Sequence, residues 1–178
     1  MYIDDNDNSL PGPSYEGVSR RYYATTIKDI NGNPVVSPVE LIGFLAVNLA
    51  SPPPPLSPAR ATNLVAICPG FERAAPKIVN AAYEGYSYAL PLSVVALNGA
   101  TISKPFGYLD SSFNQLNKVA KVTNIRRPVD QWAVTDADQV DTPSNLTWYP
   151  NLPDKPVHGN PLWNRIFFDC HIESVRKP

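Results

Sequence analysis

The chain has no long hydrophobic run. Its longest strongly apolar segment, Val39 to Leu49, contains Glu40 and Asn48, and it is well short of the roughly 20 residues that a membrane-spanning helix needs. The first residues do not show the basic, then apolar, then small-residue pattern of a signal peptide. The sequence therefore predicts no transmembrane helix.

Reactive residues and an excess of one charge are also scarce. The chain has two cysteines and two histidines, and its 15 Lys and Arg against 16 Asp and Glu leave a formal charge of -1. It contains no Gly-x-Ser-x-Gly elbow, no phosphate-binding glycine-rich loop and no Cys-x-x-Cys pair. We therefore expect neither an enzyme nor a nucleic-acid-binding protein.

Proline is what the chain has in excess. It makes up 20 of the 178 residues, well above the usual share of about 5%. Each proline removes a backbone donor and fixes φ, so long helices and central strands should be few. The length suits one domain, residues 1–178, with residues 1–18 as an extended arm and residues 51–62 as a proline-rich connector.

One main helix is predicted, from Ser37 to about Asn48. Ser37-Pro-Val-Glu40 matches a capping box, with proline at the first helical position. Leu41, Phe44 and Leu45 then recur at helical spacing and form a stripe that can lie on a sheet. Proline at the start of the connector ends this helix.

Most of the remaining chain is predicted to form short strands. The strand candidates are residues 20–27, 63–68, 91–97 and 131–135. Residues 77–84 are expected to be a short helix, and residues 112–122 either a helix or a loop that runs into a strand. Together with the main helix this is an α+β plan, one helix packed on a small antiparallel sheet with long proline-rich loops.

The chain is predicted to close with a C-terminal β-hairpin. Asn164 to Phe168 is an apolar, aromatic run suited to a buried strand, and Asp169-Cys170 stands where a tight turn would join it to a return strand. A type I′ turn favours glycine rather than cysteine, which indicates another turn type.

Three aspartates, Asp136, Asp138 and Asp141, follow the strand at residues 131–135. A loop with several carboxylate oxygens can hold calcium, and no other cofactor is required. Alternatively, these aspartates cap backbone donors and face water. The corner from Asp136 to Tyr149 also predicts a secreted calcium- or carbohydrate-binding module, although its aromatic residues suit the interior equally well.

The histidines and cysteines allow several interpretations. His158, His171 and Asp169 could be the residues of a small metal-assisted hydrolase. The simpler prediction is a hydrogen bond by which His158 fastens the long proline-rich loop at residues 141–161 to the hairpin. Cys68 and Cys170 either form one disulfide or stay as two buried thiols.

Four segments resemble one bacterial family, the pseudopilin-like proteins of type II secretion. The last contains His158, ten residues, Asp169-Cys170 and then His-Ile-Glu-Ser, where the family has His, nine residues, Asp-Gly and His-Val-Glu-Ser. The other three are the start, Met1-Tyr-Ile-Asp-Asp-Asn, the strand ending in Cys68-Pro69, and the Asp136-bearing strand.

The resemblance implies a pilin-like head and a structural function. The chain would be a non-catalytic subunit of a type II secretion or type IV pilus-like filament, without the N-terminal helix that anchors such subunits in the inner membrane. Its partners would be other pilin-like subunits, through that helix, and the secretion machinery. The head would lie in the bacterial periplasm, within the cell envelope.

Overall fold

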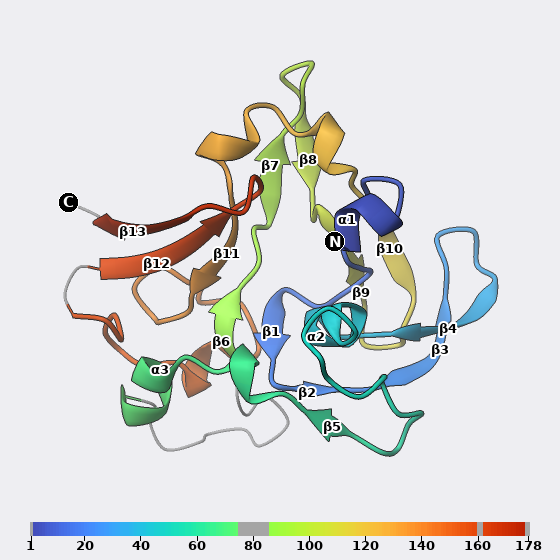
Figure 1. Ribbon diagram of the computed structural model, residues 1–178, viewed down its shortest axis with the longest axis horizontal. Helices are drawn as coiled ribbons and strands as arrows, with labels where there is room; N and C mark the ends of the chain where they lie inside the picture. Colours follow the sequence, from blue (N-terminus) through green and yellow to red (C-terminus); the bar gives the residue numbers. More distant parts are fainter. Residues whose placement is uncertain (1, 75–85, 160–161, 177–178) are drawn as a thin grey trace.

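The computed structural model describes residues 2–74, 86–159 and 162–176 and is mostly β-structure (Figure 1). Its central element is a five-stranded antiparallel sheet in the order β1-β6-β11-β12-β13. The strands of this sheet are β1 (Gly17–Ser19), β6 (Tyr86–Ala89), β11 (Trp132–Asp136), β12 (Leu162–Phe167) and β13 (Ile172–Arg176).

The described ranges also contain four two-stranded antiparallel ribbons. They are β2 (Arg21–Tyr22) with β5 (Ala61–Thr62), β3 (Ala24–Lys28) with β4 (Pro34–Pro38), β7 (Ser93–Val95) with β8 (Thr101–Ser103), and β9 (Phe106–Leu109) with β10 (Gln115–Val119). The described residues also form three short α-helices, α1 (Tyr2–Asp5), α2 (Leu41–Leu45) and α3 (Pro69–Ala74), and four 3₁₀ helices. None of them is long and apolar enough to span a membrane.

The predicted α+β, pilin-like layout is therefore wrong. The expected capping box fails because Ser37 and Pro38 end β4, where they pair with Thr25 and Ala24. Glu40 is itself the N-cap of α2, which is only five residues long. Because β4 pairs with β3, the first residues of the predicted helix are in a strand instead. The remaining five-residue helix α2 is too short to form the predicted helical layer on the sheet.

Other predictions had mixed outcomes. The strand predicted over residues 20–27 is divided between β2 and β3, and residues 63–68 contain a 3₁₀ helix, Leu64–Ala66, instead of a strand. Residues 112–122 take the second alternative, a loop that runs into β10. The helix predicted over residues 77–84 lies outside the described residues.

The strands β7 and β11 and the C-terminal hairpin are confirmed. β12 and β13 pair over five residues, from Leu162 with Arg176 to Ile166 with Ile172. Cys170 in the connecting turn has φ +71°, the left-handed conformation that glycine adopts most readily. Cys170 thus has the backbone conformation that glycine would favour at the corresponding position of the family's Asp-Gly pair.

The hydrophobic interior is divided into three clusters. The largest lies around α2 and includes Tyr22, Leu41 and Phe106. A second cluster contains Trp148 and Leu152 of the long segment between β11 and β12, together with Phe71 of α3. Because the second cluster packs against β6 and α3, it fixes the surroundings of the candidate site.

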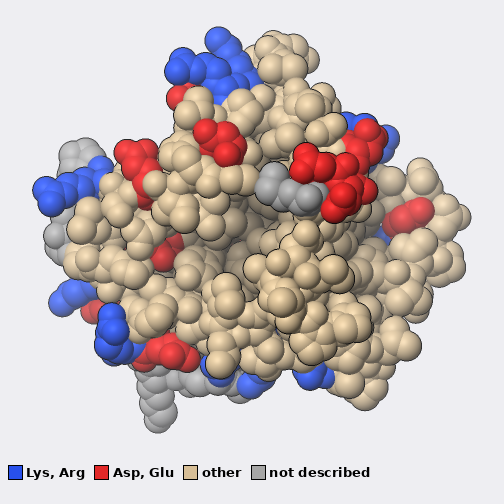
Figure 2. Space-filling view, in the orientation of Figure 1, with Lys and Arg blue, Asp and Glu red and all other residues tan. Residues whose placement is uncertain are grey.

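Charge is spread without a dominant sign. Figure 2 shows Lys, Arg, Asp and Glu scattered mainly around the margin of one face, with uncharged residues over most of its middle. This distribution agrees with the formal charge of -1 and offers no single-sign field on that face.

Candidate functional site

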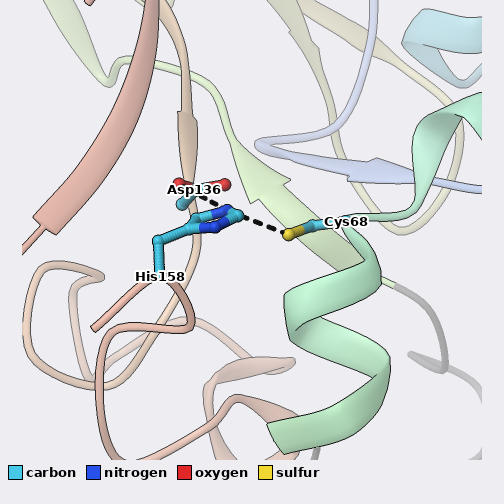
Figure 3. Close-up of side chains that lie close together, drawn as sticks. All are labelled: Cys68, Asp136 and His158. Atoms are coloured by element: carbon cyan, nitrogen blue, oxygen red, sulfur yellow. Dashed lines mark hydrogen bonds and ion pairs between the residues drawn. The ribbon is translucent and has the colours of Figure 1, made fainter. Parts of the chain in front are cut away.

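The first candidate site brings together Cys68, Asp136 and His158, which we call the clasp (Figure 3). Cys68 immediately precedes α3, which begins with Pro69, a residue favoured at the first helical position. The Cys68 backbone N–H donates to Ser87 Oγ on β6 at 3.2 Å. The thiol is therefore held at the junction of α3 and the central sheet, and Cys68 is 2% exposed.

Asp136 is the last residue of β11, opposite Tyr88 of β6. Its Oδ2 accepts a hydrogen bond of 2.7 Å from the Asn164 backbone N–H on the neighbouring strand β12. Its Oδ1 is buried and has no hydrogen-bond partner among the described residues. The Asn164 N–H thus orients the carboxylate, and the second carboxylate oxygen is buried without a donor in the described part of the chain.

His158 stands near the end of the long segment that follows β11. Its Nε2 lies 3.1 Å from Cys68 Sγ and 3.4 Å from Asp136 Oδ2. Figure 3 shows the imidazole reaching toward both side chains, with the thiol on one side and the carboxylate on the other. The side chain of His158 is 32% exposed, so the clasp is reached from solvent at the histidine.

Burial dominates the electrostatics around the clasp. It raises the pKa of Asp136, while the Asn164 hydrogen bond and the neighbouring His158 act in the opposite direction. Burial, with the nearby Cys68 and Asp136, also raises the pKa of Tyr88 to about 12. Desolvated acidic groups of this kind favour a site in which a proton or a cation neutralises them.

The three clasp side chains could hold a metal ion. One imidazole nitrogen cannot hydrogen-bond fully to a thiol and a carboxylate at once, because it carries either one proton or one lone pair. Zinc bonds of about 2.3 Å to sulfur and about 2.0 Å to nitrogen and oxygen place neighbouring tetrahedral ligands roughly 3.3–3.6 Å apart. The separation of 3.4 Å between His158 Nε2 and Asp136 Oδ2 falls within that range, the 3.1 Å between His158 Nε2 and Cys68 Sγ is shorter, and all three ligand atoms lie within 4.8 Å of one another.

The three aspartates of the calcium prediction do not converge. Asp138 is buried, and its Oδ1 accepts from the backbone N–H groups of Val140 and Asp141 while its Oδ2 accepts from Trp163 Nε1. Asp141 pairs with Arg165 at 2.9 Å. Calcium binding by these aspartates stays a prediction. The carboxylates of Asp138 and Asp141 already accept hydrogen bonds from groups of the protein.

The remaining predicted residues lie apart from the clasp. Asp169 Oδ1 is 2.6 Å from His171 Nδ1 in the hairpin turn, where both side chains are more than a third exposed. His158 contacts Asp136 at the end of β11 and Cys68 just before α3. The predicted hydrogen bond from His158 therefore fastens the long segment to these residues instead of to the hairpin. Cys68 and Cys170 are both free thiols, the first buried and the second exposed.

A second candidate site is a cleft of about 740 Å³ that none of the clasp residues lines. Its walls include Tyr15, Tyr23, Glu40, Tyr108 and Trp148. Sequence reasoning missed this cleft because it assigned Glu40 to a helix cap and because the tyrosines come from distant segments. No local pattern brings such residues together.

No family model, curated protein or solved structure matches the chain. The geometry of the clasp and of the cleft therefore carries the functional argument, together with the sequence motifs.

Proposed function

We propose that this chain is a non-catalytic structural subunit, similar to the pilin-like subunits of secretion filaments, whose head is held in shape by a metal ion in the clasp. The observation that carries the proposal is the meeting of Cys68, Asp136 and His158. Each of the three belongs to a different segment of the family resemblance: the Cys-Pro strand, the aspartate-bearing strand and the histidine before the terminal hairpin.

One residue from each of three motifs lies in the same cluster. The residues are far apart in the sequence, and only folding brings them within 4.8 Å of one another. If each residue stabilised only its own turn or strand, nothing would bring the three side chains together in the fold. Their convergence supports the resemblance independently of the helix layout, which the β-rich fold has replaced.

The clasp joins three parts of the head. Cys68 immediately precedes α3, Asp136 is the last residue of β11, and His158 belongs to the long segment between β11 and β12. Zinc with a thiolate and a carboxylate is formally neutral, which suits two ligands that are each 2% exposed. A metal ion at this point fastens the long segment to the central sheet.

The arrangement favours a structural role over a cysteine nucleophile. A thiol activated by histidine needs the thiol on one ring nitrogen and the orienting carboxylate on the other. Here both groups face Nε2 of His158. The imidazole therefore lies between two metal-type ligands rather than between a nucleophile and its orienting partner.

In this proposal the partners are other pilin-like subunits and the secretion machinery, and the head lies in the bacterial periplasm. As the family resemblance implies, the subunits would associate mainly through a membrane-anchored N-terminal helix. The head alone should then be monomeric or only weakly associated.

Chemical cross-linking of the complete gene product in cells of its source tests this function. We expect envelope fractions to give a ladder of species at multiples of the subunit mass, detected with an antibody against residues 1–178. The matched control is the 178-residue chain expressed alone, which should remain a single species. A complete gene product that cross-links no further than the isolated chain contradicts the proposal.

A further inference from the structure

The cleft around Glu40 is built from segments that are distant in the sequence. Its lining comes from the residues before β1, from β9, from the start of α2 and from residues 145–148 of the long segment. A volume of about 740 Å³ lies within the range of small-molecule binding sites. The cleft is therefore large enough for a ligand of one to a few rings.

Aromatic rings form much of the cleft. Tyr15, Tyr23 and Tyr108 are half-buried and so present part of their rings and hydroxyl groups to it. Deeper in the wall, Trp148 stacks on Tyr86, with ring centroids 5.6 Å apart and planes 20° apart. Trp148 is 4% exposed, so it supports the wall. Among the half-buried tyrosines, Tyr23 has the Arg60 guanidinium over its ring and Tyr108 has Lys104 Nζ 4.6 Å from its ring centroid. A ligand therefore meets Tyr15 and the ring surface that these two cations leave uncovered.

Glu40 supplies an unused polar group. It is 5% exposed, and its Oε1 accepts a hydrogen bond from the Tyr86 hydroxyl at 3.2 Å. Its Oε2 is buried without a hydrogen-bond partner among the described residues. A buried polar atom that lines a cleft and lacks a partner indicates a place where a ligand completes the hydrogen bonding.

The protonation state of Glu40 defines the chemistry of that partner. Burial raises its pKa to about 8, against the weaker effects of the Tyr86 hydrogen bond and of Arg60. At neutral pH the side chain is therefore mostly a carboxylic acid, which offers an O–H donor as well as an acceptor. Such a group suits the hydroxyl and ether oxygens of an uncharged ligand.

The charged side chains around the cleft do not favour an ionic ligand. Glu16 pairs with Lys104. The Arg60 guanidinium lies 3.4 Å from the Tyr23 ring centroid, and its Nη1 donates to the carbonyls of Pro58 and Ala59. Charges of both signs thus line or adjoin the cleft and have partners within the protein.

We infer that this cleft binds an uncharged, hydroxyl-rich ring compound of the carbohydrate class. Aromatic faces contact the apolar side of a sugar ring, while Glu40 and the tyrosine hydroxyls exchange hydrogen bonds with its polar edge. The inference does not depend on the proposed assembly function or on the clasp, because none of the three clasp residues lines the cleft.

Saturation-transfer NMR with a panel of neutral gluco-, galacto-, manno- and xylo-oligosaccharides tests the inference on the 178-residue chain. We expect at least one member to bind saturably. Tyr108→Ala should weaken binding about tenfold, which corresponds to the loss of one ring contact. Glu40→Leu, which removes the donor but keeps an apolar side chain, should weaken it as well.

Tyr2→Ala is the matched control, because Tyr2 is also a half-buried tyrosine but does not line the cleft. Its affinity for the same sugar should equal that of the wild type, and circular dichroism should show that all variants are folded. Three results would overturn the inference: no neutral sugar binds, Tyr108→Ala and Tyr2→Ala bind equally well, or tetramethylammonium or glucuronate binds where neutral sugars do not.

Discussion

Two buried carboxylates, Asp136 in the clasp and Glu40 in the cleft, each leave one oxygen without a hydrogen-bond partner among the described residues. Their surroundings differ. Asp136 faces a thiol and an imidazole, which can share a cation with it, whereas Glu40 faces tyrosines and has a single tyrosine hydrogen bond. Burial thus raises both pKa values, but the neighbours favour a cation at one site and a proton at the other.

The largest effect should come from the ionisation of Glu40. Its pKa is about 8 when folded and 4.5 as its ordinary value, so the folded state holds an extra proton between these pH values. Stability should therefore fall as the pH rises from about 4.5 to about 8, by at most about 5 kcal/mol at ~1.4 kcal/mol per pKa unit. The groups that face Glu40 are Tyr15, Tyr23, Tyr86 and Arg60.

Urea unfolding of wild type and Glu40→Gln across pH 5 to 9 measures this effect. Glutamine is nearly isosteric and cannot ionise, so the variant should lose most of the fall and be more stable than wild type at pH 8. Parallel stability profiles of the two proteins would show that Glu40 titrates normally.

The next largest effect concerns the clasp. When free zinc exceeds its Kd a thousandfold, a single site should raise the free energy of unfolding by about 4 kcal/mol. Asp136→Asn and His158→Phe should abolish the effect, because the first removes the negative charge of the carboxylate ligand and the second removes the imidazole nitrogen. Thermal unfolding of chelator-treated protein with and without zinc, together with zinc stoichiometry, provides the measurement.

Asp141→Asn is the control for the zinc experiment. Asp141 is a nearby aspartate that pairs with Arg165 rather than with the clasp, so this variant should still bind one zinc ion per chain. Equal zinc responses from Asp136→Asn and Asp141→Asn would remove the metal assignment from the clasp.

The contrast also shows what the sequence could predict. The C-terminal hairpin was predictable because an apolar run, a turn pair and an alternating strand are all local patterns. The start and the length of the main helix were not, because Ser37-Pro-Val-Glu40 satisfied a local rule while the pairing of β4 with β3 depended on contacts elsewhere. Tertiary pairing outweighed a capping signal that a short helix could not use.

The two candidate sites show the same difference between what local sequence patterns predict and what depends on tertiary contacts. Cys68, Asp136 and His158 were each singled out because cysteine, aspartate and histidine have recognisable chemistry, yet nothing in their spacing predicted that they would meet. Glu40 had no such signal, because its importance arises from burial that only the folded chain provides. Reactive residue types can thus be nominated from sequence, whereas their grouping and desolvation require the fold.

A smaller effect is expected in the hairpin turn. Cys170 has φ +71°, which costs a residue with a side chain more than it costs glycine. Cys170→Gly should therefore stabilise the protein by about 0.5 kcal/mol, after the entropy of glycine in the unfolded chain is subtracted. Chemical denaturation checks this, and Cys170→Ala, which keeps the Cβ, should show no such gain.

The smallest effect should come from the second aspartate–histidine pair, which is exposed. The hydrogen bond from His171, above all, lowers the pKa of Asp169, and the His171 ring stacks on Phe167 with centroids 4.2 Å apart. His171→Phe keeps a stacked ring and removes the hydrogen bond. The pKa of Asp169, followed by NMR titration, should rise toward its ordinary value, while the unfolding midpoint at neutral pH stays unchanged.

The corresponding change in the clasp, His158→Phe, makes this a matched comparison. Both variants replace an imidazole beside an aspartate with a phenyl ring, but only His158 lies beside a buried carboxylate and a buried thiol. The exposed pair is solvated and screened, so His171→Phe should leave zinc binding at one ion per chain. Loss of zinc from His171→Phe, with retention by His158→Phe, would place the metal at the hairpin turn instead of the clasp.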